Sequence, residues 1–329
     1  MKQRSAFISG ISLTFAMYSV FRIPSMKETI LTTLQFCTQT LIPALFPLIL
    51  ICKFSSLVIA QNSKLNAANK KAFTLFLSWI GGYPSGVSLI KDEIEEGSAF
   101  EREICIYSCA SIGYTMQAVG MFLCRDLVFG ICLYFAQILF SLFTAPPNRP
   151  QTCAATEAQE ASIIHSISTV QCLTQSIRDA AETMLYVSSF TIVFSSLSDL
   201  LSSFLPFPYS KEILRNIFEF STGNQFAWKT FSQPIALFLI GFSIGFGGLS
   251  IHAQIYSAII DKINSYRIII GSKLLCGILT GIFAFLYSFS WQYSLLFLFS
   301  VFLVKICKKK IKKNKKYKEI CRRKVPKMV

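Results

Sequence analysis

The sequence predicts an all-α, polytopic membrane protein built from two repeated halves, with broken helices and re-entrant hairpins. Three observations predict this class: an excess of apolar residues, long runs without charge, and polar or glycine-rich interruptions that recur in both halves. Of the 329 residues, 53% are hydrophobic and only 15% are charged. A soluble domain of this size could not cover so much apolar side chain, so a very apolar soluble α-helical protein is the weaker alternative.

Charged residues are spaced so that several long runs could each cross a bilayer. A crossing needs about 20 mostly apolar residues. We therefore expect seven to nine membrane elements and a multi-pass position in the cell membrane, with the lipid bilayer as the surrounding partner. The uncharged runs are residues 5–21, 29–52, 72–90, 104–124, 127–148, 230–260 and 274–304.

A short basic segment followed by an apolar run predicts a first membrane span over residues 1–27. Lys2 and Arg4 precede the run, and Arg22 and Lys27 follow it without an obvious small-residue cleavage motif. A signal peptide begins in the same way, but the missing motif favours an uncleaved span.

The net charge of +15 belongs mainly to a basic tail, residues 305–329. This tail holds 13 of the 32 basic residues and one acid, Glu319. Basic residues that flank a span stay in the cytoplasm and attract anionic lipid headgroups. We therefore expect a cytoplasmic C-terminus. Nucleic-acid binding is not expected, because Tyr317 alone could stack on a base.

Eleven cysteines are scattered along the chain without a Cys-x-x-Cys pair, and most lie inside apolar runs. There they are expected to behave as small hydrophobic side chains. The sequence thus predicts no disulfide framework, no metal site and no cofactor.

Matched segments divide the chain into a first half over residues 28–144, a polar linker over 145–162 and a second half over 163–304. The linker is followed by an amphipathic helix over about 163–184, which could lie at the interface or pack along the bundle. Internal duplication with paired interruptions is typical of secondary transporters, and the sequence leaves open whether the halves are inverted or parallel. The matched pairs are LIPALF (41–46) with LYVSSF (185–190), GGYPSG (81–86) with STGNQF (221–226), and SIGYT (111–115) with FGGLS (246–250).

Segment lengths predict where helices are broken. Residues 72–80 are about half a crossing long and end at GGYPSG, so we expect a hairpin that turns at 81–86 and leaves on the side it entered. Residues 230–260 are too long for one span of a ~30 Å hydrocarbon core, so we expect a break at GFGGLS, residues 245–250. A simple loop between two spans is the alternative for GGYPSG.

Irregular backbone at membrane depth survives only inside protein or beside a wet cavity, so these breaks predict a binding cavity. The N-termini of half-helices attract anions, and their C-termini offer carbonyls to Na⁺ or H⁺. Glu219, between two phenylalanines, is a candidate cation or proton site with Thr222, Gly223 and Asn224. The alternative is an interfacial glutamate near Arg215.

The sequence also suggests roles for three further polar residues. His252 and Gln254 follow the break at 245–250, and we weigh ligand binding there equally with plain helix contacts. Asp199 is expected to cap the end of a helix.

The segments WIGGYPSGVSLIKDEIEEG, ETMLYVSSFTIVFSSL, EFSTGN and GFGGLSIHAQIYSAI come in an order that resembles the YlbJ family of sporulation integral membrane proteins, which carry a nucleoside-recognition (Gate) domain. The resemblance covers residues 30–305. It implies a role in endospore formation, transport of dipicolinic acid and a place in the outer forespore membrane. Position by position, it implies as substrate-binding residues Gly82, Tyr83, Pro84, Ser85, Gly86, Glu219, Thr222, Gly223, Asn224, Gly247, Gly248, Ser250 and Gln254.

We therefore expect a transporter-like protein that moves a small anionic or nucleoside-like solute, with H⁺ or Na⁺ as the coupling ion. A non-transporting membrane scaffold or sensor required for sporulation is the alternative. An enzyme is least expected, because the sequence holds no paired carboxylates, metal cluster or nucleophile–base set at membrane depth, and His165 and His252 fit no dyad.

Overall fold

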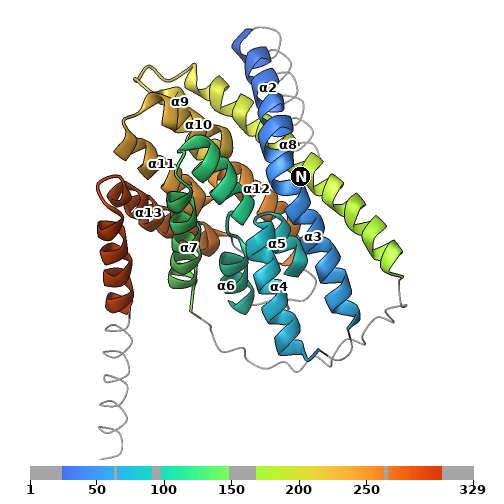
Figure 1. Cartoon of the computed structure of the whole chain (residues 1–329). Coiled ribbons are helices and arrows are strands. Elements are labelled where there is room, and N and C mark those ends of the chain that lie inside the picture. The colour runs from blue at the N-terminus through green and yellow to red at the C-terminus, as the bar shows by residue number, and fades with distance from the viewer. Residues whose placement is uncertain (1–23, 63–64, 91–97, 148–167, 263–265, 306–329) are drawn as a thin grey trace, which may run out of the picture.

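The computed structural model describes residues 24–62, 65–90, 98–147, 168–262 and 266–305, and within these ranges it contains helices and no β-strand (Figure 1). Most of the predicted first span, most of the linker and the basic tail after Lys305 lie outside the described residues. In chain order the elements are α2 (Pro24–Phe36), the π-helix η1 (Cys37–Leu41), α3 (Ile42–Gln61), α4 (Ala67–Gly81), α5 (Ser85–Ile90), α6 (Ser98–Tyr107), the π-helix η2 (Gly113–Leu123), α7 (Leu127–Thr144), α8 (Thr169–Ser202), α9 (Ser210–Phe218), α10 (Phe220–Thr230), α11 (Gln233–Phe246), α12 (Gly248–Ile259), the short 3₁₀-helix η3 (Ile260–Lys262) and α13 (Arg267–Tyr287).

Five stretches of helix in the described residues are long and apolar enough to cross a membrane. This confirms an all-helical chain with several apolar helices, whereas seven to nine membrane elements were expected; the remaining apolar runs form shorter helices, among them Trp291–Lys305. The five stretches are Met26–Gln61, Leu127–Thr144, Thr169–Ser202, Gln233–Ile259 and Arg267–Tyr287.

Several helices begin at a polar residue whose side chain accepts a hydrogen bond from a free backbone N–H group of the first turn. Asn66 does so at the start of α4, and Asp126 does so at the start of α7. Ser168 and Gln171 form a reciprocal capping box that begins α8. Because these caps satisfy donors that have no partner inside the helix, they fix where each helix starts. The amphipathic helix expected over 163–184 is the first part of the longer α8.

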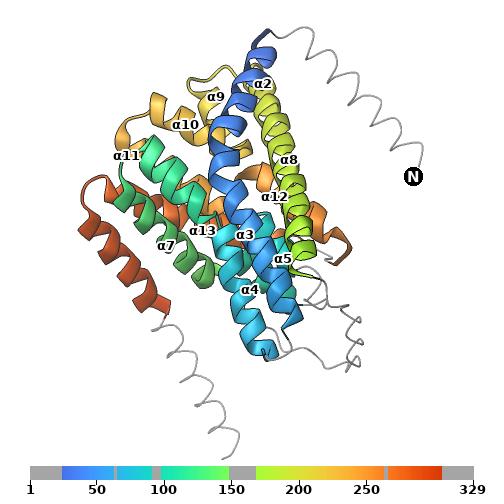
Figure 2. The ribbon, with the colours of Figure 1, turned by 45° about the vertical axis from the view of Figure 1, so that its right-hand side comes forward.

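The rod formed by α2, η1 and α3 lies antiparallel to α8 (Figure 2). At one end of the pair the Thr29 hydroxyl donates to Asp199, and at the other the Gln61 amide donates to Cys172 Sγ at 3.1 Å. A second group of long helices consists of α7, α11 and α13, in which α13 contacts both of the others. The short helices α5, α9, α10 and α12 contact one another or the long helices of this frame.

Four glycines allow α11 and α13 to approach each other closely. Gly241 and Gly245 on α11 form one small-xxx-small pair, and Gly277 and Gly281 on α13 form the other. A Cβ atom on Gly245 would lie 2.8 Å from the Cα atom of Gly277. Close backbone approach through such pairs is a common way for apolar helices to associate where lipid removes the hydrophobic drive.

This packing predicts that Gly277→Ala destabilises the protein, because its new Cβ atom would lie 2.8 Å from the carbonyl oxygen of Phe242. We expect a loss of about 1–3 kcal/mol in the free energy of unfolding, measured as a lower thermal midpoint in detergent. The matched control is Gly271→Ala on the same helix, where nothing lies within 4 Å of the added atom. Equal midpoints for the two variants would contradict the close contact.

Candidate functional site

Four helix breaks interrupt the short helices, close to the positions that the sequence predicts. The first break (Gly82–Pro84) separates α4 from α5, and the second (residues 108–112) separates α6 from η2. The third is Glu219, between α9 and α10, and the fourth is Gly247, between α11 and α12. One position requires correction. Residues 221–224, expected to form the third break, are instead the first turn of α10, because the Glu219 carboxylate caps that helix one step earlier.

At the first break the backbone turns through Gly82, whose φ of +70° is favourable only for glycine. The Tyr83 backbone N–H donates to the carbonyl of Cys109 at 2.9 Å, so the first break is joined to the second. A Cβ atom on Gly82 would lie 2.4 Å from the backbone nitrogen of Ser111. Glycine is therefore required both for the turn and for the contact between the two breaks.

At the second break, side chains from other helices satisfy backbone groups that have left the helix. The Gln137 amide from α7 accepts from Ala110 N–H at 3.1 Å and donates to the Ala110 carbonyl at 3.0 Å. The Lys273 ammonium from α13 donates to the carbonyl of Ser108 and to the Ser141 hydroxyl, the latter at 3.4 Å. Buried backbone groups without a partner are costly, so these two side chains make the unwound segment tolerable.

At the third break, the Glu219 carboxylate accepts four hydrogen bonds from the start of α10. The donors are the backbone N–H groups of Ser221 (3.2 Å) and Thr222 (2.7 Å) and the hydroxyl groups of both residues (2.8 Å each). Glu219 is only 1% exposed. The predicted alternative of an interfacial glutamate near Arg215 is not what the structure shows, because Arg215 pairs with Asp199 instead. Since Glu219 already occupies this helix N-terminus, an anionic solute cannot bind there.

At the fourth break, α11 ends and α12 begins through two glycines with positive φ, Gly247 (+96°) and Gly248 (+68°). A Cβ atom on Gly248 would lie 3.2 Å from the backbone nitrogen of Phe220, so α12 starts directly against the third break. A Cβ atom on Gly247 would lie 3.7 Å from the ring of Tyr83. The fourth break therefore touches both the first and the third.

Aromatic rings from both parts of the chain meet where the breaks converge. The Phe220 ring makes edge contacts with Tyr83 at 5.6 Å and with Tyr114 at 4.9 Å between centroids. The Tyr83 hydroxyl donates to the carbonyl of Ile244 at 3.2 Å, and the Asn224 amide donates to the Tyr114 hydroxyl at 3.1 Å. These contacts join residues more than 100 positions apart into one cluster.

The cluster lines a central cavity of about 20 Å³, enough for one water molecule. Of the described residues that line it, Tyr83 and Glu219 belong to the predicted site. Tyr114, Phe220 and Thr191 also line it, and the sequence analysis did not single them out.

The other predicted residues lie at or beside the breaks in several roles. Tyr83 and Pro84 are joined by a cis peptide bond. Gly86 permits a backbone contact, because its Cβ atom would lie 2.7 Å from the carbonyl of Tyr107. Gly223 does the same for α9, with a Cβ position 2.4 Å from the Asn216 Cα atom. The Asn224 amide oxygen accepts from the Ser243 hydroxyl at 2.6 Å.

Ser85, Ser250 and Gln254 are each at most 1% exposed, and their side-chain polar atoms find no hydrogen-bond partner among the described residues. His252 is likewise buried, and its Nδ1 atom lies 3.1 Å from the Tyr266 hydroxyl. Within the described ranges, no group of three His, Cys, Asp or Glu side chains could hold a metal ion.

A buried ion pair between Arg215 and Asp199 was missed by the sequence analysis, which expected Asp199 to cap a helix end. The guanidinium pairs with the Asp199 carboxylate and lies 4.5 Å above the ring of Phe226. Arg215 is 1% exposed and Asp199 is 6% exposed. Asp199 faces α9 rather than its own helix end because Arg215 and Thr29 both reach it. The signal in the sequence was the position of Asp199, the one charged residue between Glu182 and Lys211, shortly before a helix that carries Arg215.

We predict that Asp199→Asn lowers the free energy of unfolding by about 3–5 kcal/mol, because it leaves the buried Arg215 charge without a counter-charge. Thermal unfolding in detergent measures this loss. We expect the double variant Asp199→Leu/Arg215→Met to recover most of it, since both charges are then gone.

The matched control is Glu103→Gln, which breaks the exposed pair with Lys71. We expect a change within about 1 kcal/mol there. If Asp199→Asn and Glu103→Gln lowered stability equally, the account of a buried pair would be wrong.

The chain was compared with known proteins in three ways. A scan against protein-family models found no match, and searches of curated proteins and of solved structures likewise found none.

Proposed function

We propose that this chain is a multi-pass membrane transporter that moves a small solute past the four helix breaks. The observation that most directly supports this proposal is that all four breaks converge on one cluster of Tyr83, Tyr114 and Phe220 between long apolar helices. Broken helices that meet in the interior are the usual architecture of solute sites in secondary transporters. Several helices of spanning length support a position in the membrane.

Three cavities lie in order along the rod of α2 and α3, which supports a route through the protein. The threonine cavity, lined by Thr33 and its neighbours on α2, has about 270 Å³. The central cavity is lined by Leu41 and Leu45. The α3–α8 cavity, lined by Lys53 and Asp179, has about 480 Å³. Thr33 and Lys53 are 20 residues apart on nearly continuous helix, about 30 Å at 1.5 Å per residue, which equals the thickness of the hydrocarbon core.

Residues of α8 contact the same three cavities in turn, in the opposite chain direction. Asp179 and Glu182 line the α3–α8 cavity, Val187 and Thr191 line the central cavity, and Asp199 pairs with Arg215 of the threonine cavity. The wide cavities therefore lie on either side of a narrow centre. A centre that holds one water is closed to a solute, so transport requires the short helices beside it to move.

The resemblance on the sequence suggests a small anionic or nucleoside-like solute, with dipicolinate as the first to test and the outer forespore membrane as the location. Glu219 is the proposed site of the coupling ion, H⁺ or Na⁺, because its carboxylate is buried and lines the central cavity. In this proposal the C-terminus lies in the cytoplasm.

Uptake into vesicles that contain the purified protein tests this function. We expect the wild type to accumulate dipicolinate or a nucleoside under an H⁺ or Na⁺ gradient. Gly248→Leu and Gly82→Leu should abolish uptake while leaving membrane insertion intact, because each fills a contact between two breaks. Glu219→Gln should remove the dependence on the ion gradient.

Gly271→Leu is the control, because its Cβ atom meets open space on α13. Wild-type uptake by a well-inserted Gly248→Leu variant would contradict transport through the breaks, whereas a wild type that moves no solute under any gradient would favour a scaffold or sensor. A wild type that moves neither solute would contradict the proposed solute class.

A further inference from the structure

We infer that the threonine cavity is a binding site for a small monoanionic solute that carries a carboxylate on an apolar ring. The inference deepens the proposed transport function, and its role in transport rests on that proposal. This cavity adjoins the third break at Thr222, which is the one residue of the thirteen assigned to the site by the sequence that lines it.

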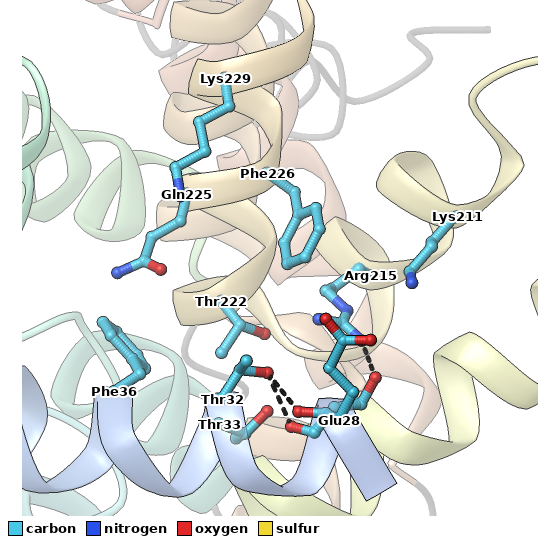
Figure 3. Close-up of a pocket in the computed structure, with 11 residues that line it drawn as sticks. Glu28, Thr32, Thr33, Phe36, Lys211, Arg215, Thr222, Gln225, Phe226 and Lys229 are labelled. Atoms are coloured by element: carbon cyan, nitrogen blue, oxygen red, sulfur yellow. Dashed lines mark hydrogen bonds between the residues drawn. The ribbon is translucent and has the colours of Figure 1, made fainter. Parts of the chain in front are cut away.

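The cavity combines side chains from two sides (Figure 3). On one side, α2 contributes Glu28, Thr32, Thr33 and Phe36. Thr29 of the same helix also lines the cavity. On the other side, α9 and α10 contribute basic, polar and aromatic side chains. These are Lys211, Arg215, Thr222, Gln225, Phe226 and Lys229. Hydrogen-bond donors around an apolar ring slot are the usual composition of a small-molecule pocket.

Two residues that line the cavity each carry a buried polar atom without a partner among the described residues. One is the hydroxyl oxygen of Thr33, a residue that is 2% exposed, and the other is Nε of Arg215, which is 1% exposed. The neighbouring Thr32 hydroxyl, by contrast, already donates to the carbonyls of Glu28 and Thr29. A buried donor without a partner is destabilising, so an acceptor such as a carboxylate would complete both groups.

The charge balance of the cavity calls for one negative charge. Lys211, Arg215 and Lys229 line it together with Glu28, and Asp199 lies behind it, paired with Arg215 and 3.5 Å from Lys211. Three positive and two negative side chains leave a balance of +1. A monoanion brings the group to neutrality, whereas a neutral solute leaves the excess charge.

The volume of the cavity and its two aromatic rings indicate the size and the apolar part of the solute. At about 270 Å³ the cavity lies just below the range of ~300–1,000 Å³ that suits drug-sized ligands, so a molecule with a single ring fits. Phe36 and Phe226 supply apolar surface for that ring.

Equilibrium binding to the purified full-length protein in detergent tests the site without requiring transport. The probes are benzoate, its neutral analogue benzamide, and inorganic phosphate, each measured by calorimetric titration. We expect benzoate to bind, and benzamide and phosphate to bind at least about tenfold more weakly, since each lacks the charge or the ring. We expect Thr33→Val and Lys211→Gln each to weaken benzoate binding by about tenfold.

Thr33→Val removes a hydroxyl that bonds to no described group, so it should leave the thermal midpoint unchanged or higher. Thr38→Val is its control, because the Thr38 hydroxyl bonds to its own helix and lies outside the cavity lining. Arg178→Gln, on the exposed face of α8, is the control for charge. Both controls should bind benzoate as the wild type does.

Absence of benzoate binding by folded protein would overturn the inference, and so would equal binding of benzamide or an unchanged affinity in Thr33→Val. Equal binding of phosphate would overturn the apolar-ring part. Binding that depends on Thr33 together with normal uptake by Gly248→Leu would uphold this site and reject transport through the breaks. If Gly248→Leu lost uptake and the wild type did not bind benzoate, transport through the breaks would be upheld and this site would be rejected.

Discussion

The structure depends on one constraint: backbone groups released at a helix break must find partners inside a largely apolar protein. At the first three breaks, neighbouring groups supply these partners. Gln137 and Lys273 reach the second break from other helices, and Glu219 satisfies the start of α10 from within the third. The Tyr83 backbone N–H uses a carbonyl of the second break. Because the breaks partly satisfy one another, they lie together.

Their convergence gives the molecule two kinds of part. Long helices form a frame in which facing glycines join α11 to α13, and the Asp199–Arg215 pair joins α8 to the short helix α9. Short helices end at the breaks and meet around Phe220 through ring contacts and a few hydrogen bonds, and side chains of α5 and α12 also join the main hydrophobic core. The narrow central cavity lies between two wider ones, as the proposed transport function requires.

The sequence predicted the helical class and the breaks near Gly82 and Gly247, because both are local properties. Gly82 and Gly247 adopt backbone conformations that only glycine adopts readily, and long uncharged runs mark spanning helices. The sequence could not predict which side chains would pair with the breaks or with one another. Lys273 and Gln137 read as ordinary polar residues in or beside apolar runs, and only the tertiary fold brings them to residues 108–110. Arg215 and Asp199 likewise find each other across two helices. The shift of the third break to Glu219 depends on a carboxylate capping α10, which the run STGN obscured.

Accessibility of cysteines placed along the rod tests the central claim, a closed centre between two cavities that open to opposite sides. Thr32→Cys, Ser56→Cys and Thr191→Cys would each be made in a background that lacks accessible cysteines. That background replaces Cys124 and Cys132, which are partly exposed among the described cysteines, together with the cysteines outside the described residues. A membrane-impermeant thiol reagent would be applied to each face of reconstituted vesicles. We expect Thr32→Cys, exposed in the threonine cavity, to react from one face only, Ser56→Cys from the other only, and the buried Thr191→Cys from neither. Labelling of the first two from the same face would contradict the central claim.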